Sequence, residues 1–114
     1  MFHSWLRPAA LAAGLMLGTS AALAASAEKG KTAFVTYGCF QCHGTVGQGG
    51  VAGLKLAPNP MPYEALASFV RNTNRQMPPY SEAVLPNDAL ADIYAYLQSA
   101  PPTPDYKTIP LLKD

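Results

Sequence analysis

Two cysteines and a histidine form the group of residues in this chain that is best suited to chemistry. Cys39, Cys42 and His43 are arranged as C-x-x-C-H. On a helical turn, side chains at positions i and i+3 point to the same side, so both sulfurs can reach the two vinyl groups on one edge of a haem. The neighbouring imidazole then comes up beneath the iron. The motif therefore predicts one covalently attached haem c, with thioethers from Cys39 and Cys42 and with His43 as an axial iron ligand.

The same three residues allow two other interpretations. A bare C-x-x-C pair can form a redox-active disulfide, but that chemistry is usual in a βαβ setting, and the sequence has no strand with convincing alternation. A zinc site needs four protein ligands, or three and a water. Cys39, Cys42 and His43 could supply three ligands only with poor geometry, so the haem interpretation is favoured over both.

The sixth ligand of the haem iron has to come from another part of the chain. His43 is the only histidine beyond the N-terminal segment, which excludes two histidine ligands from one chain. Met77 lies 34 residues after His43, far enough for the chain to reach the opposite haem face, in a loop stiffened by two prolines. Met61 lies only 18 residues after His43 and follows a glycine-rich loop that must first pass the haem edge. Met77 is the predicted ligand, and ligation by Met61 or an open site are the alternatives; either methionine can also simply fill the core.

The first 24 residues have the plan of a secretory signal peptide. A positive charge at Arg7 precedes an apolar run over residues 9–17, and Ala22-Leu23-Ala24 is a small-x-small cleavage site. Cleavage as late as residue 27 also fits. A spanning helix needs about 20 apolar residues, and this run is interrupted by glycines. We therefore expect a periplasmic protein that would be attached to a membrane only if the signal stayed uncleaved.

Composition bounds what the rest of the chain can be. With 114 residues and a net charge of +1, it is one small domain, and its charge excludes a nucleic-acid binder that works by neutralising phosphates. Two cysteines exclude a disulfide-stapled scaffold. The eleven prolines and nine glycines exceed the average share of these residues and indicate long loops.

Hydrophobic periodicity predicts three helices joined by loops. The first covers residues 26–37, with Ser26 as N-cap; the second starts with Pro62 at its first position; the third is capped by Asn87 and stopped by Pro101. Residues 44–60 and 72–86 are loops, and the proline-rich segment 101–114 is expected to be extended. The predicted fold class is small all-α, with three main helices and a haem-binding turn with long loops. The predicted domains are the signal (1–24), a haem domain (25–100) and the tail.

Three motifs, in this order, resemble those of class I c-type cytochromes of the small bacterial type, over residues 27–100. They are Gly30 and Phe34 before Cys39-x-x-Cys42-His43-Gly44, then Met77-Pro78-Pro79-Tyr80, then the run from Leu90 to Leu97. The resemblance implies a small cytochrome c fold, in which the first and last helices cross, with Gly30 and Phe34 against Ile93, Tyr96 and Leu97. It also implies that a backbone carbonyl of the loop after the haem motif accepts a hydrogen bond from Nδ1 of His43. This loop has Gly53-Leu54 where the family often has Gly-Pro.

The resemblance implies a periplasmic monohaem cytochrome that carries single electrons between redox proteins and is not itself an enzyme. Its partners would be a periplasmic dehydrogenase and a terminal oxidase or another cytochrome. It could accept electrons from the dehydrogenase or be the haem subunit of that enzyme. The alternative is an open-site haem protein, peroxidase-like or gas-sensing. Arg71 and Arg75 are candidates to hold a haem propionate or are simply solvated, and Tyr80 packs on the haem or fills its loop.

Overall fold

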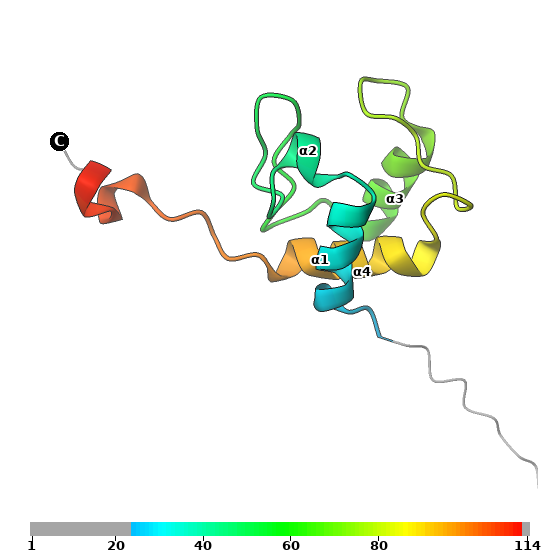
Figure 1. Ribbon diagram of the computed structural model, residues 1–114, viewed down its shortest axis with the longest axis horizontal. Coiled ribbons are helices and arrows are strands. Elements are labelled where there is room, and N and C mark those ends of the chain that lie inside the picture. Colours follow the sequence, from blue (N-terminus) through cyan, green and yellow to red (C-terminus); the bar gives the residue numbers. More distant parts are fainter. Residues whose placement is uncertain (1–23, 113–114) are drawn as a thin grey trace, which may run out of the picture.

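The structure, a computed structural model, describes residues 24–112 and contains no strand in that range. Figure 1 shows its helices and the long loops between them. The elements are α1 (Ala27–Thr36), α2 (Phe40–His43), α3 (Tyr63–Asn72), α4 (Asn87–Ser99) and two short 3-10 helices, η1 (Tyr106–Thr108) and η2 (Pro110–Leu112). The predicted all-α class, with three main helices and a single turn at the haem motif, is confirmed.

Helices α1 and α4 cross in direct contact, as Figure 1 shows. Gly30 lies at the contact, and a Cβ built on it would be 1.8 Å from the carbonyl oxygen of Asp92. One turn further along α1, the rings of Phe34 and Tyr96 pack at a centroid distance of 5.6 Å. The predicted crossing is therefore present, and it depends on the absence of a side chain at Gly30.

The N-termini of the helices differ in how they are capped. Ser26 caps α1, as predicted, because its hydroxyl accepts a hydrogen bond from the amide of Lys29. Its own amide donates to Asp92 Oδ1 at 2.6 Å, which ties the start of α1 to α4. The predicted cap at Asn87 is wrong: Pro86 is the N-cap of α4 and Asn87 is its first residue. The Asn87 side chain is instead the acceptor of a hydrogen bond from Arg71. In the same way Pro62 is the N-cap of α3 and not its first residue.

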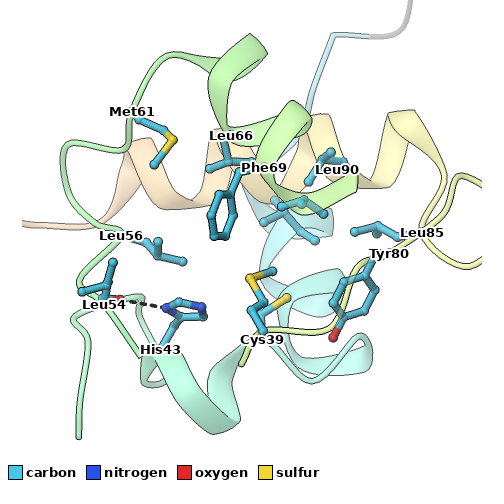
Figure 2. A pocket seen from close by; sticks show the side chains of 13 residues that line it. Cys39, His43, Leu54, Leu56, Met61, Leu66, Phe69, Tyr80, Leu85 and Leu90 are labelled. Carbon is cyan, nitrogen blue, oxygen red and sulfur yellow. Dashed lines mark hydrogen bonds between the residues drawn. The ribbon is translucent and has the colours of Figure 1, made fainter. Parts of the chain in front are cut away.

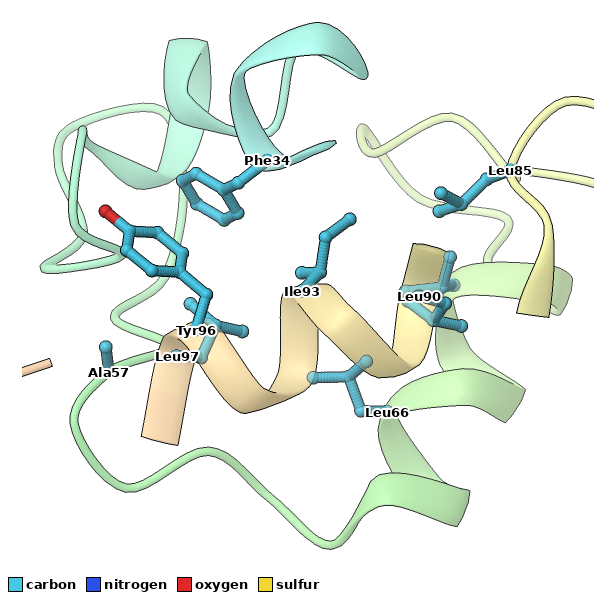
Figure 3. Packing of buried hydrophobic residues seen from close by; sticks show 9 residues of the cluster. Phe34, Ala57, Leu66, Leu85, Leu90, Ile93, Tyr96 and Leu97 are labelled. Atoms are coloured by element: carbon cyan, nitrogen blue, oxygen red, sulfur yellow. The ribbon is translucent and has the colours of Figure 1, made fainter. Parts of the chain in front are cut away.

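A single hydrophobic core is built mainly on α4 (Figure 3). The buried apolar side chains are Phe34, Ala57, Leu66, Val70, Leu85, Leu90, Ile93, Tyr96 and Leu97. They come from α1, α3, α4 and both long loops, so each loop is attached to the core at one buried residue, Ala57 or Leu85. This arrangement holds the loops in place although they have no regular structure.

The loop after the haem motif folds back on itself at Gly47. The carbonyl of Gly47 accepts hydrogen bonds from the amides of Leu56 and Ala57 at 2.8 and 2.9 Å. Gly47 has a φ of +71°, and a Cβ there would lie 2.6 Å from a methyl group of Leu97. A glycine is therefore needed both for the backbone conformation and for the close approach to α4.

The tail is not fully extended, and this prediction is wrong for its second half. Residues 106–112 form η1 and η2, in which Asp105 accepts hydrogen bonds through its carboxylate from the amide of Lys107 and through its carbonyl from Thr108. Asp105 thus acts as a local cap, a signal that proline content alone does not carry. Figure 1 shows the segment before η1 running away from the helices.

The N-terminal segment and the domain boundaries stay predictions. The proposed signal peptide lies outside the described residues except for Ala24. Within residues 24–112, no helix is long and apolar enough to cross a membrane.

Candidate haem-binding site

The C-x-x-C-H motif lies on the short helix α2, directly after α1. Gly38, with a φ of +78°, turns the chain between the two helices, and the amide of Cys39 donates to the Phe34 carbonyl at 3.1 Å. The amide of His43 donates to the Cys39 carbonyl at 3.0 Å, which closes the helical turn across the motif. The Cys39 side chain is half-buried and the Cys42 side chain is exposed, so the two sulfurs stand at the edge of the domain.

The imidazole of His43 is oriented by the glycine-rich loop (Figure 2). Nδ1 of His43 donates a hydrogen bond to the Leu54 carbonyl at 2.8 Å. A proton on Nδ1 leaves the lone pair of Nε2 free to bind a metal, and the carbonyl raises the basicity of the ring. The carbonyl that the resemblance implies in this loop is therefore present, although leucine stands where the family often has proline.

Gly53 makes that hydrogen bond possible. A Cβ on Gly53 would lie 2.6 Å from the Cys42 carbonyl oxygen and 3.0 Å from Nδ1 of His43. The loop approaches the motif more closely than any side chain at position 53 would allow. The orientation of His43 therefore depends on a glycine outside the motif itself.

His43 faces a cleft made of two adjoining cavities. The inner cavity, of about 140 Å³, has an apolar wall, and the outer one, of about 660 Å³, opens beside Cys42. Cofactor sites usually measure about 300–1,000 Å³, so the cleft has the size of such a site. The residues that line both cavities are Cys39, His43, Leu54, Phe69, Met77 and Tyr80.

The two methionines lie in different positions relative to the cleft. Met77 lines both cavities, together with His43. Met61 lines only the inner cavity, and 47% of its surface is exposed. Met77 is therefore the methionine that shares both cavities with the histidine.

The two arginines considered for a propionate also differ. The guanidinium of Arg71 donates to the Tyr80 carbonyl at 2.9 Å and to Asn87 Oδ1 at 2.8 Å. Arg75 lines the outer cavity beside Cys42. Arg71 thus has a structural role within the protein, whereas Arg75 is the cation at the mouth of the cleft.

Burial changes the acidity of the groups in the cleft. It raises the pKa of the Cys39 thiol, and burial, followed by the nearby cysteines, raises the pKa of the Tyr80 phenol. The reactive cysteine of a thiol–disulfide protein has a lowered pKa, so the raised pKa of Cys39 argues against the thiol–disulfide interpretation.

The zinc interpretation has no support in the structure. Residues 24–112 hold no cluster of three or more His, Cys, Asp or Glu side chains that could bind a metal ion.

These residues fit a covalently bound haem. The cleft combines an apolar wall, two cysteines at its edge, an imidazole with a free Nε2 and a thioether. Sequence reasoning missed most of the apolar wall, including Leu56, Leu85 and Leu90. Phe69 carried a signal: it stands beside the apolar stripe of α3, and in the structure it lines both cavities and not the core.

Comparison with known proteins agrees with the site. The protein-family model described as "Cytochrome C oxidase, cbb3-type, subunit III" matches residues 25–97. The comparisons with curated proteins and with solved structures found no match. The matched segment is more than half of the chain and contains the haem motif, Met77 and all four α-helices up to Leu97. The chain therefore belongs to this family of class I c-type cytochrome domains, and it carries a covalently attached haem c.

Proposed function

We propose that this cytochrome carries single electrons between redox proteins in the periplasm. Cys39 and Cys42 would hold the haem through two thioethers, and His43 and Met77 would be the protein ligands of its iron. The family accounts for a haem electron carrier; the ligand set, the compartment and the partners are our proposal. When bound, the haem supplies a one-electron Fe(III)/Fe(II) couple.

One observation carries the proposal: His43 and Met77 line the same cleft, and the hydrogen bond from Nδ1 to Leu54 leaves Nε2 of His43 free for the iron. If His43 and Met77 both bound the iron beside the four porphyrin nitrogens, no coordination position would remain for a substrate or for oxygen. A methionine ligand is soft, favours Fe(II) and raises the reduction potential relative to a second histidine. The site is therefore suited to electron transfer and not to chemistry on a bound substrate.

The glycine-rich loop and the exposed part of α2 would form the docking face. Val51 and Leu54 on this loop are highly exposed, with relative accessibilities of 111% and 81%, and Ala52, Gly53 and Leu54 border the outer cavity. The net charge of the chain is close to zero, so long-range electrostatic steering is weak. We expect a small, largely apolar and transient contact.

The proposed partners are those that the resemblance to class I c-type cytochromes implies for an exported electron carrier. A periplasmic dehydrogenase would donate electrons to this cytochrome, which could be its acceptor or its haem subunit. A terminal oxidase or another cytochrome would accept them. Residues 1–24 would direct the chain to the periplasm, where the thioether bonds form.

Absorption spectra of the matured protein test the ligand set. We expect a low-spin c-type spectrum with the weak far-red band of a methionine–Fe(III) bond. Met77→Ala should lose this band, and its reduced form should bind carbon monoxide. Met61→Ala is the matched control, because Met61 also lines the inner cavity, and it should keep the band.

The opposite result would change the class of function. A wild-type protein that is already high-spin, or that binds carbon monoxide readily, would have an open site and would be a catalytic or gas-sensing haem protein. Loss of the band in Met61→Ala and not in Met77→Ala would assign the sixth ligand to Met61.

A further inference from the structure

Tyr80 is the point at which the loop carrying Met77 is attached to the rest of the domain. Its amide donates to the Val70 carbonyl at 2.9 Å, and its hydroxyl donates to the Tyr37 carbonyl at 2.9 Å. Its own carbonyl accepts from Arg71 Nη1 at 2.9 Å. One residue thus makes three hydrogen bonds, through its amide, its carbonyl and its side chain.

These bonds connect the loop to α3 and to the end of α1. Val70 and Arg71 belong to α3, and Tyr37 is the residue that ends α1. The other guanidinium nitrogen of Arg71, Nη2, donates a hydrogen bond to Asn87 Oδ1 at 2.8 Å, at the start of α4. Tyr80 and Arg71 therefore hold the loop at the junction of α1, α3 and α4.

Met77 itself packs against the hydrophobic core, but within the described part of the chain no hydrogen bond of the loop segment around it fixes its backbone. Among the described residues 24–112, no hydrogen bond involves the backbone of residues 76–79. Pro78 and Pro79 separate Met77 from Tyr80, and each proline has a fixed φ. The two fixed φ angles limit how far Tyr80 and Met77 can move independently of each other, and both side chains line the same two cavities.

We infer that Tyr80 is a positioning residue for Met77, and that its phenol bond to the Tyr37 carbonyl determines how readily Met77 gives way to an external ligand. The inference rests on the proposed role of Met77 as an axial ligand. The Tyr80 ring lines the cleft whether or not it carries a hydroxyl, so its contribution to packing and that of its hydrogen bond can be separated.

The expected effect follows from the population of the displaced state. An external ligand binds only when Met77 has left, so its apparent affinity scales with the fraction of molecules in which the loop is open. One neutral hydrogen bond shifts such an equilibrium by roughly two- to tenfold. Tyr80→Phe should therefore bind added imidazole about two to ten times more tightly than the wild type.

The experiment is an imidazole titration of the oxidised holoprotein, followed by loss of the far-red methionine band. Tyr96→Phe is the matched control, because the Tyr96 hydroxyl also donates to a backbone carbonyl at 2.9 Å, that of Thr45 on the histidine side of the cleft. We expect similar decreases in the unfolding midpoint for both variants. Only Tyr80→Phe should bind imidazole more tightly.

Each possible result is decisive. If Tyr80→Phe and the wild type bind imidazole equally while the wild type shows the band, Met77 is the ligand but Tyr80 does not position it. Equal tightening in Tyr96→Phe would mean that general destabilisation is the cause, and it would also overturn the inference. Absence of the band from the wild type would overturn the proposed ligation together with this inference.

Discussion

The replacement of Gly30 by alanine should open the crossing of α1 and α4. A Cβ at this position would lie 1.8 Å from the carbonyl oxygen of Asp92, 2.4 Å from its carbonyl carbon and 2.9 Å from the Cβ of Tyr96. The first two are backbone atoms of α4, which no rotamer change can move. Carbon–oxygen contacts between helices normally start at about 3.3 Å, so α1 would have to move away by more than about 1 Å.

The free energy of this displacement can be worked out from its parts. Alanine gains about 1 kcal/mol over glycine in helix propensity. Against this, overpacking costs about 1–3 kcal/mol, and the displacement also weakens the packing of Phe34, whose complete truncation would cost about 3–5 kcal/mol. With about a third of the Phe34 packing lost, about 1–2 kcal/mol, Gly30→Ala should lower the unfolding free energy by about 1–4 kcal/mol.

Denaturant unfolding of the oxidised holoprotein, followed by circular dichroism, measures this loss. Gly50→Ala is the control, because a Cβ on Gly50 would lie at an ordinary distance of 3.7 Å from the Cys42 carbonyl oxygen. Its stability should change by no more than about 0.5 kcal/mol. If Gly30→Ala were as stable as Gly50→Ala, the close contact of α1 with α4 would not be a feature of the folded protein.

Three further predictions concern the His43 loop, the cysteines and the tail. Gly53→Ala would bring a Cβ to 3.0 Å from Nδ1 of His43 and should weaken the hydrogen bond from Nδ1 to the Leu54 carbonyl. The imidazole would then be less basic, so voltammetry should show a higher reduction potential. The increase should be at most about 40 mV, which corresponds to the loss of one hydrogen bond of about 1 kcal/mol. Burial raises the pKa of the Cys39 thiol, and its side chain is half-buried whereas that of Cys42 is exposed. In haem-free protein, mass spectrometry should therefore find slower alkylation at Cys39 than at Cys42, and the rate at Cys39 should rise with pH because the thiolate is the reactive form; equal rates at the two cysteines would contradict this. Deletion of residues 101–114 should change the free energy of unfolding by less than about 0.5 kcal/mol, because the hydrogen bonds of Asp105 stay within the tail. Denaturant unfolding measures this change. A larger decrease in the free energy of unfolding would show that the tail packs on the domain.

Much of the fold is determined by local sequence. The helical spacing of apolar residues predicts α1, α3 and α4, because positions i, i+3 and i+4 share one face of a helix whatever the rest of the chain does. The cap at Ser26 and the turn at the C-x-x-C-H motif depend on neighbours within a few residues. The identity of the cofactor follows from the same short motif, and the family match agrees with it.

Contacts between distant residues could not be predicted in this way. The side chain of Arg71, considered for a propionate, donates instead to residues 9 and 16 positions later, and Tyr80 donates to a carbonyl 43 positions earlier. Asn87 looks like a helix cap in the sequence, but Arg71 binds its side chain and Pro86 takes the cap position.

The amino-acid sequence by itself therefore determined the three main helices and the covalent cofactor, and it predicts the pair of iron ligands that we propose. Only the tertiary structure decided which carbonyl orients His43, which residues line the cleft and what holds the Met77 loop. The physical reason is that helices and the haem motif depend on fixed spacings along the chain. The partners of Leu54 and Tyr80 depend on the paths of two long loops, and those paths are set by buried contacts at Ala57 and Leu85.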